Sequence, residues 1–240
     1  MRIAVISDIH ANLPALESVE RSLKSDAPDT IVVLGDISSK GAFPRECADR
    51  LFSADALMVR GNAEDRMTED VPEPDGSCET FVELCRMEHW MRERLDERQM
   101  YEMARLPGEL ELETPQGTWW MYHATPGNPA RAVLPWRTPG FLDEITQGKK
   151  IAKIVYAHVH HAFCLSLAGR LIVNSGSVGS PFDGDPRASY VLLDMCRSRT
   201  DVTVRRVEYN IALAVQAARQ RGFPACDRYE HMLTYARYPW

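Results

Sequence analysis

Three short apolar runs alternate with two helical segments over the first sixty residues, and each run ends in a polar residue. The runs are Ile3–Ile6, Thr30–Leu34 and Ala56–Val59, and helices are expected at 13–25 and 44–52. Apolar runs of this length with β-branched members are typical of strands that are buried on both faces. The β-α-β-α-β order therefore predicts an α/β protein containing a parallel sheet with right-handed crossovers.

Strand and hairpin signals continue through the second half of the chain. Pro115-Gln116-Gly117 and Ala168-Gly169-Arg170 are turn sequences, and each separates two short strand-like runs. Each turn therefore predicts a β-hairpin. The strands expected here span residues 109–113, 118–122, 151–157, 163–167, 171–173, 189–194 and 201–207, and a helix is expected at 210–220.

Residues 79–106 interrupt the strand pattern with a helical insertion. Apolar side chains such as Phe81, Leu84 and Trp90 recur there at three- and four-residue intervals, which is typical of amphipathic helices. The insertion is expected to form two helices that either cover the sheet or pack over one edge of a functional site. No linker or internal repeat divides the 240 residues, so we predict a single domain over residues 1–240.

The composition argues against several classes of function. A net charge of −6 disfavours non-specific nucleic-acid binding, which needs clustered lysine and arginine. No apolar run approaches the ~20 residues of a membrane helix, and the N-terminal run is too short for a signal peptide. The six cysteines are scattered without CxxC pairs, as expected of reduced thiols. We therefore expect a cytoplasmic protein that does not bind membranes.

Seven polar residues stand where apolar runs end, on five separate predicted strands. An extended backbone would point Asp8 and His10, which are two positions apart, to the same side. Ligand sites of open α/β sheets lie at the carboxyl ends of the strands. A single histidine at such a place is usually structural, but two carboxylates, an amide and four imidazoles together suit two borderline divalent metal ions. The seven residues are Asp8, His10, Asp36, Asn62, His123, His158 and His160.

Asp36 is the candidate bridge between the two ions. Paired metal ions in hydrolases lie ~3.5–4 Å apart and need a shared anionic ligand. Asp36 can supply one carboxylate oxygen to each ion.

The same residues form a series of short motifs. SDIH at 7–10, GD at 35–36, GN at 61–62, the isolated His123 and HVH at 158–160 occur in this order. The series resembles the calcineurin-like metallophosphoesterases, and the resemblance extends to the stretch NSGSVGSPFDGDPRASY at 174–190. That stretch is similar to bacterial and archaeal members related to the diadenosine tetraphosphatases. The superfamily also includes serine/threonine protein phosphatases.

The resemblance implies a four-layer α-β-β-α sandwich with two metal ions at the carboxyl ends of the strands. It implies that a hydroxide bridging the ions attacks phosphorus in line. Manganese is the expected metal, while iron, nickel, cobalt or zinc would suit the same donors. His161 matches no ligand position and is interpreted as structural. The implied ligands are Asp8, His10, Asp36 and His160 for one ion, and Asp36, Asn62, His123 and His158 for the other.

Ala63 departs from the family pattern. Many members have a histidine after the GN motif, and this histidine is thought to protonate the leaving oxygen. General acid catalysis is typically worth ~10²–10⁴-fold, so activated aryl esters and some diesters should be the better substrates. His89 in the insertion is a possible replacement. Glu64 would be available to orient a histidine restored at position 63.

Lys40 and Arg131 are the candidate substrate-binding residues. Lys40 stands in place of a phosphate-gripping arginine, and its ammonium cannot give the bidentate grip of a guanidinium. Arg131, like Trp136 and Arg137, lies in the irregular loop after His123. Lys40 could equally be a solvated loop lysine, and side chains such as the other three are more often ordinary surface than substrate contacts.

The sequence thus predicts a hydrolase dependent on two metal ions that acts on a small phosphate ester, either a monoester or a diester. The alternative is a non-catalytic binding scaffold on the same fold, as in a retromer subunit that resembles this family. Such scaffolds have lost metal ligands, whereas this chain keeps all seven. The sequence predicts neither the physiological substrate nor the oligomeric state.

Overall fold

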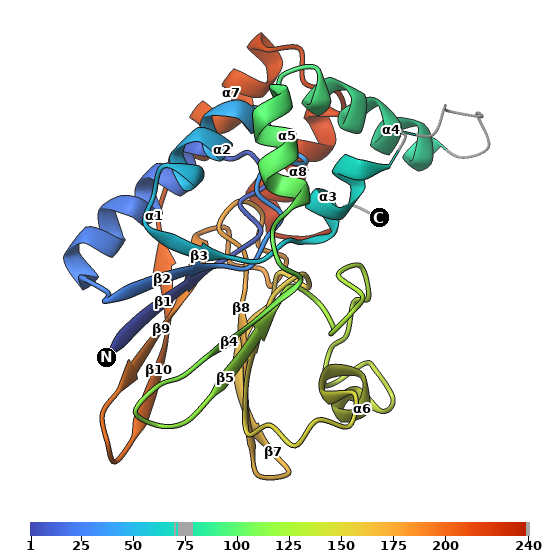
Figure 1. The fold of residues 1–240 in the computed structure, drawn as a ribbon. Coiled ribbons are helices and arrows are strands. Elements are labelled where there is room, and N and C mark those ends of the chain that lie inside the picture. The colour runs from blue at the N-terminus through green and yellow to red at the C-terminus, as the bar shows by residue number, and fades with distance from the viewer. Residues whose placement is uncertain (70, 72–78, 239–240) are drawn as a thin grey trace.

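Two five-stranded mixed β-sheets form the centre of the computed structural model, which describes residues 1–69, 71 and 79–238 (Figure 1). The strand orders are β10-β9-β1-β2-β3 and β4-β5-β6-β8-β7. The strands of the first sheet are β1 (Arg2–Ile6), β2 (Thr30–Val33), β3 (Ala56–Met58), β9 (Ala188–Met195) and β10 (Thr200–Val207). Those of the second sheet are β4 (Glu109–Leu112), β5 (Trp119–Tyr122), β6 (Lys153–Tyr156), β7 (Ala162–Leu167) and β8 (Arg170–Ser175).

The predicted parallel unit is present as β1, β2 and β3. Ile3 pairs with Thr30, and Ile31 pairs with Ala56, both in parallel register. The first sheet as a whole is mixed, because β9 pairs antiparallel with β1 and brings β10 with it. This pairing joins the two ends of the chain, so no local pattern around β1 indicates it.

The two predicted hairpins and the buried strand between them form the second sheet. β4 pairs antiparallel with β5, and β7 pairs antiparallel with β8. β6 lies between β5 and β8 and is parallel to both. The carboxyl ends of β5 and β6 therefore lie at the same edge of this sheet.

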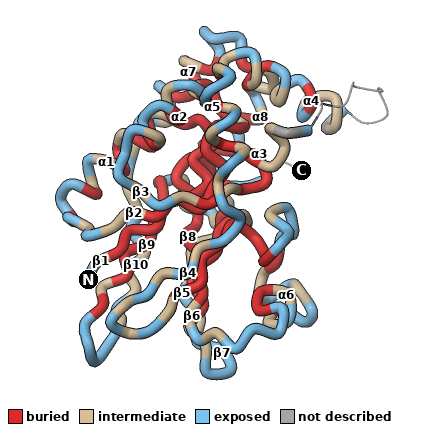
Figure 2. Tube along the Cα trace, viewed as in Figure 1, coloured by how far each residue is buried: buried red, intermediate tan, exposed pale blue. Residues whose placement is uncertain are grey.

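The sheets pack face to face, and helices cover their outer faces, as the predicted four-layer fold requires (Figure 1). Val5, Val32 and Val173 are among the side chains that fill the space between the sheets. Figure 2 shows that buried residues are concentrated on inner strands such as β1, β8 and β9. The first sheet is covered by α1 (Leu13–Asp26), α2 (Pro44–Phe52), α7 (Ile211–Gln220) and α8 (Cys226–Tyr235), and the second by α6 (Phe141–Thr146).

The insertion forms two helices, as predicted. They are α4 (Glu79–Arg92) and α5 (Glu97–Ala104), and the short α3 (Asn62–Asp65) and a 3₁₀ turn at Arg66–Thr68 precede them. Buried Met91 of α4 and Met103 of α5 join the core over the first sheet. Among the described residues, no helix has both the length and the apolar character needed to cross a bilayer. The single domain over residues 1–240 stays a prediction.

Candidate metal centre

The loops that follow β1, β2, β3, β5 and β6 meet at one edge of the sandwich and carry all seven candidate ligands. The first two loops lie against each other, since the N–H of Asp8 donates to the Gly35 carbonyl at 3.0 Å and that of His10 to the Asp36 carbonyl at 2.9 Å. The N–H of His158 donates to Asp8 Oδ2 at 3.1 Å. Six of the seven residues are buried, and His158 is half-buried. The structure thus brings together the residues that the sequence pattern selected, and we call them the cluster.

Five residues of the cluster have a left-handed backbone. Aspartate and histidine enter this region more readily than most residues, yet such strained positions cost about 1–3 kcal/mol each. The expected extended backbone at Asp8 and His10 is therefore wrong, because turns aim these two side chains. Strain of this kind concentrates at functional sites. The φ angles lie between 48° and 66° for Asp8, His10, Asp36, His158 and His160.

Asp8, His10 and His160 form the first half of the cluster. The Nε2 atoms of His10 and His160 lie 3.1 Å apart. Asp8 Oδ1 lies 3.2 Å from His160 Nε2 and 3.7 Å from His10 Nε2. One potential ligand atom from each residue lies within 4.8 Å of the other two, so a single ion could contact all three.

Asp36, His123 and His158 form the second half, with Asn62 beside them. His123 Nε2 lies 3.6 Å from Asp36 Oδ1 and 3.1 Å from His158 Nδ1. The side-chain oxygen of Asn62 lies 3.2 Å from the same His123 nitrogen. This half also offers one ligand atom from each of its three ionisable residues within 4.8 Å.

Asp36 reaches both halves. Its Oδ2 lies 3.7 Å from His10 Nε2 in the first half, and its Oδ1 lies 3.6 Å from His123 Nε2 in the second. Asp8 Oδ1 also lies 3.9 Å from His123 Nε2, so the halves form one continuous group. This position suits the bridging role expected of Asp36.

Carbonyl groups orient two of the imidazoles. His123 Nδ1 donates to the Leu34 carbonyl at 2.6 Å, and His160 Nδ1 donates to the Ser180 carbonyl. Because a carbonyl can only accept, each Nδ1 carries a proton, and each Nε2 can present a lone pair to the cluster. Partners of this kind are typical of metal-binding histidines.

Each carboxylate of the cluster has one oxygen held by the protein and one that is not. Asp8 Oδ2 accepts hydrogen bonds from the Ser7 hydroxyl and the His158 N–H, and Asp36 Oδ1 accepts one from the Ala63 N–H. Asp8 Oδ1 and Asp36 Oδ2 are buried and accept no hydrogen bond from the described residues. Burying such an oxygen without a partner is costly, and a cation between these atoms would remove that cost. The oxygen and nitrogen donors thus fit divalent metal ions.

The cluster is electrostatically suited to cations. Burial raises the pKa of Asp36, but the neighbouring His123, His10 and Lys40 outweigh burial and lower it. Burial lowers the pKa of His123, but the charges of Asp36 and Asp8 outweigh burial and raise it. Burial lowers the pKa of His158 to about 3. Ionised carboxylates beside a neutral imidazole are the state that metal binding requires.

Glu64 joins the loop after β2 to the loop after β3, a role that sequence reasoning missed. Its carboxylate accepts backbone hydrogen bonds from Asp36, Ile37 and Gly61 at 2.7, 2.8 and 2.8 Å. Burial and the charge of Asp36 raise the pKa of Glu64 to about 7, although these three bonds lower it. The close approach needs glycine, since a Cβ on Gly35 would lie 2.2 Å from the Gly61 nitrogen.

The Glu64 carboxylate thus anchors two loops, and its use in orienting a ring at position 63 stays a prediction. Ala63 itself is fully buried. The sequence signal for the role of Glu64 was its position shortly after the GN motif.

The stretch at 174–190 supports the loop after β1. The Ser177 hydroxyl donates to the Asp8 carbonyl at 2.8 Å, and the N–H of Val178 donates to the Ser7 carbonyl at 3.0 Å. The N–H of Gly179 donates to the same Asp8 carbonyl at 2.9 Å. This stretch therefore fixes the position of Asp8 without contributing a cluster side chain.

A cavity of about 440 Å³ opens beside the second half of the cluster. Asn62 and His158 line one side of it, Ser39 and Lys40 line another, and α4 contributes much of the rest. After burial, the charge of Lys40 is the next largest cause of the lowered pKa of His10, which indicates that the ammonium group lies near the cluster. The cavity has the size of an ordinary small-molecule site.

The other candidates from the sequence lie outside the cluster and do not line this cavity. Arg131 pairs with Glu144 at 2.8 Å, and the exposed Trp136 packs edge-on against Phe163. Arg137 and His89 are exposed. His161, which was interpreted as structural, has its Nδ1 2.6 Å from the Val159 carbonyl.

Comparisons with known proteins agree with this geometry. The model of the calcineurin-like phosphoesterase superfamily domain matches residues 1–198. A metallophosphoesterase from Sphaerobacter thermophilus is 28% identical, with 98% of this chain and 100% of that chain covered and a TM-score of 0.77. A hypothetical protein from Pyrococcus horikoshii OT3 has the same fold, with 18% identity, a TM-score of 0.81 and coverage of 100% and 98%. An uncharacterised protein of Methanocaldococcus jannaschii is 28% identical over 92% of this chain and 93% of its own length.

Proposed function

The chain belongs to the calcineurin-like phosphoesterase superfamily, and from this membership we propose that it is a phosphoesterase that works with two divalent metal ions. The observation that supports this most directly is the pair of buried oxygens, Asp8 Oδ1 and Asp36 Oδ2, which accept no hydrogen bond from the described residues. In this proposal Asp8, His10, Asp36 and His160 hold one ion, and Asp36, Asn62, His123 and His158 hold the other. Manganese is the metal that we propose.

When bound, the two ions would supply an activated water as nucleophile and positive charge for the phosphoryl oxygens. The chain itself prepares the site for them. The Leu34 and Ser180 carbonyls keep the Nε2 lone pairs of His123 and His160 aimed into the cluster. Lys40 adds a positive charge at the cavity beside the cluster, where it would contact a phosphoryl oxygen as a point charge.

The chain offers little help to a poor leaving group. In the described residues, His158 is the one histidine that lines the cavity, and it belongs to the cluster. Ala63 supplies no proton. We therefore propose that activated aryl esters, whether monoesters or diesters, are turned over faster than alkyl esters. A small phosphate ester as substrate and a cytoplasmic location belong to the same proposal.

Hydrolysis of p-nitrophenyl phosphate and bis-p-nitrophenyl phosphate tests this function. Both assays are run on the purified protein with manganese and again after chelation. We expect release of p-nitrophenolate from at least one ester with manganese and almost none after chelation. The matched control is Asp201→Asn, which removes an exposed carboxylate on β10 far from the cluster and should hydrolyse both esters at the wild-type rate.

Absence of hydrolysis with manganese, iron, nickel, cobalt and zinc would contradict the proposed activity. If the protein bound these metals without hydrolysing either ester, the alternative of a non-catalytic scaffold would replace it.

A further inference from the structure

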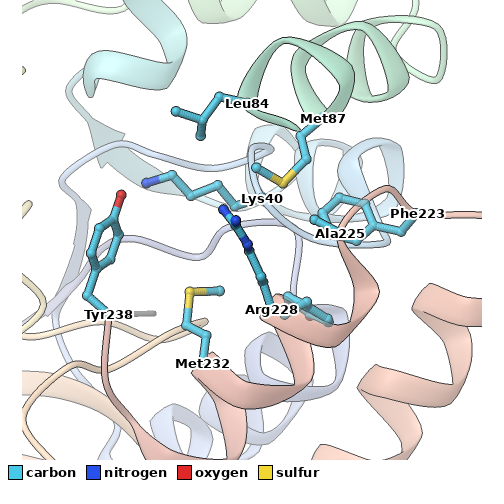
Figure 3. A pocket seen from close by; sticks show the side chains of 9 residues that line it. Lys40, Leu84, Met87, Phe223, Ala225, Arg228, Met232 and Tyr238 are labelled. Atoms are coloured by element: carbon cyan, nitrogen blue, oxygen red, sulfur yellow. The ribbon is translucent and has the colours of Figure 1, made fainter. Parts of the chain in front are cut away.

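The cavity beside the cluster continues past Lys40 into a region lined by apolar side chains. Leu84 and Met87 approach it from α4, and Met232 approaches it from α8 (Figure 3). A second cavity of about 30 Å³, with room for about one water molecule, lies there, so a larger group would also occupy the adjoining part of the main cavity. Lys40, Leu84, Met87 and Tyr238 line both cavities, so the two adjoin.

We infer that this region binds the ester group of the substrate and that this group is apolar, either aromatic or branched aliphatic. We call the region the apolar subsite and define it by Leu84, Met87, Phe223, Met232 and Tyr238. The inference rests on the proposed function and deepens it, because it names the class of phosphate ester.

The two ends of the combined cavity differ in polarity. At the cluster end, Ser39, Asn62 and His158 offer polar atoms, and Lys40 forms no ion pair with a described residue. At the other end most of the lining side chains are apolar, and the polar groups besides Lys40 are the hydroxyls of Tyr229 and Tyr238 and the guanidinium of Arg228. A ligand that matches both ends is anionic at one end and apolar at the other. A sugar or a peptide would leave polar groups without partners there.

Most of the other charged residues along the cavities are paired. Glu88 lies 3.2 Å from Arg92 and 3.7 Å from Arg66, and these three residues line the outer side of the larger cavity. Arg228 lines the smaller cavity and pairs with Glu83 at 2.7 Å. Glu69 also lines the larger cavity, so two glutamates offset the two arginines there, and Glu83 offsets Arg228. Lys40 therefore supplies the remaining positive charge that an anionic ligand would meet.

Aromatic stacking connects the subsite to the cluster. The ring of Tyr238 packs edge-on against Phe182, with centroids 5.1 Å apart, and Phe182 stacks on His160 at 4.1 Å. The Arg228–Glu83 ion pair also joins α8 to α4. The subsite therefore occupies a defined position relative to the candidate metal ligands, as a site for one part of a substrate must.

Binding of two non-hydrolysable phosphonates tests the inference without turnover. Isothermal titration calorimetry measures the affinities of phenylphosphonate and methylphosphonate for the manganese-loaded protein. We expect the wild type to bind phenylphosphonate at least about tenfold more tightly, because its ring leaves water. Leu84→Glu should reduce this ratio to about threefold or less. Leu84 is 37% exposed, so the substitution leaves the core intact.

Leu213→Glu is the matched control. Leu213 is 50% exposed on α7 and lines neither cavity, so this variant should keep the wild-type ratio. Equal affinities in the wild type, or an unchanged ratio in Leu84→Glu, would overturn the inference. Hydrolysis of the p-nitrophenyl esters would in that case still support the proposed function. If neither phosphonate bound and neither ester were hydrolysed, the proposed function would fail first.

Analytical ultracentrifugation of the wild type and Leu84→Glu tests whether a second copy of the chain covers the subsite. If the wild type were a dimer and Leu84→Glu a monomer, a second copy of the chain would cover the subsite, and the inference would be wrong. We expect both proteins to sediment alike.

Discussion

The cluster and the apolar subsite face adjoining cavities, but the chain holds them in place differently. The cluster side chains follow strand ends, and backbone hydrogen bonds such as that from His10 to the Asp36 carbonyl join their loops. Leu84 of the subsite lies on α4 and is 37% exposed, and Tyr238 lies in the segment after α8 and is 47% exposed. Hydrogen bonds between loops fix the ligand atoms closely, whereas side-chain packing fixes a shape.

If both proposals hold, the metal chemistry and the substrate selectivity lie on separate elements of the fold. The family model ends at residue 198, so α8 and Tyr238 lie beyond the matched part of the chain. Changes in the cluster should therefore reduce turnover of every substrate, whereas changes in the subsite should alter the order of preference among substrates.

The largest effect is expected from Asp36→Asn, which removes the charge that reaches both halves of the cluster. Two ions would then repel each other without a shared anion, and at least one should be lost. Loss of a metal ion removes several kcal/mol of charge stabilisation, which corresponds to about 10³-fold or more in kcat. Elemental analysis measures metal content, and circular dichroism should show the fold intact. Normal metal content in Asp36→Asn would refute the bridging geometry.

Metal removal should lower thermal stability. A ligand that binds only the folded state at 1,000 times its Kd stabilises it by about 4 kcal/mol. For a chain of this size that corresponds to a fall in Tm of roughly 10 °C after chelation. Differential scanning fluorimetry with manganese and with chelator measures the change. Leu84→Glu should show the same fall, because the subsite holds no metal, and a smaller fall in this variant would weaken the separation of the two regions.

The smallest effect is expected from Ala63→His, which restores the family residue. If an imidazole there donates a proton, kcat/KM for glycerol phosphate should rise several-fold relative to p-nitrophenyl phosphate, below the ~10²–10⁴-fold of a fully positioned general acid. Ala63 is buried, so the new ring must displace its neighbours, and Ala63→Gln controls for this bulk. An unchanged ratio, or wild-type activity that is equal on both esters, would show that no acid is needed at this position.

The cluster was predictable because its residues mark strand ends. Asp36 and His123 each follow an apolar run, and the carboxyl ends of buried strands converge wherever the strands lie side by side. The orientation of Asp8 and His10 was not predictable from spacing, since their left-handed φ angles are set by hydrogen bonds to the loop after β2. The role of Glu64 likewise depends on two loops that meet only in the folded chain.

Long-range packing accounts for the rest of what sequence reasoning missed. The antiparallel pairing of β9 with β1 joins opposite ends of the chain, and no local signal near Ile3 indicates it. The sequence predicted the helix that carries Leu84, but not that Met232 from the other end of the chain would meet it. Arg131 was predicted to bind substrate because of its charge and its place in the loop after His123, but it forms an ion pair with Glu144 of α6.

The Glu64 carboxylate also joins two loops of the cluster to each other without using any residue of the insertion. It holds N–H groups of Asp36, Ile37 and Gly61, so the loops after β2 and β3 move together. Shortly after Glu64, the chain forms the 3₁₀ turn at Arg66–Thr68 that precedes the insertion. We therefore expect a displacement of α4 to leave the spacing between the two candidate metal positions unchanged. An insertion of different length or composition could be exchanged in evolution or in the laboratory while the chemistry at the cluster is preserved.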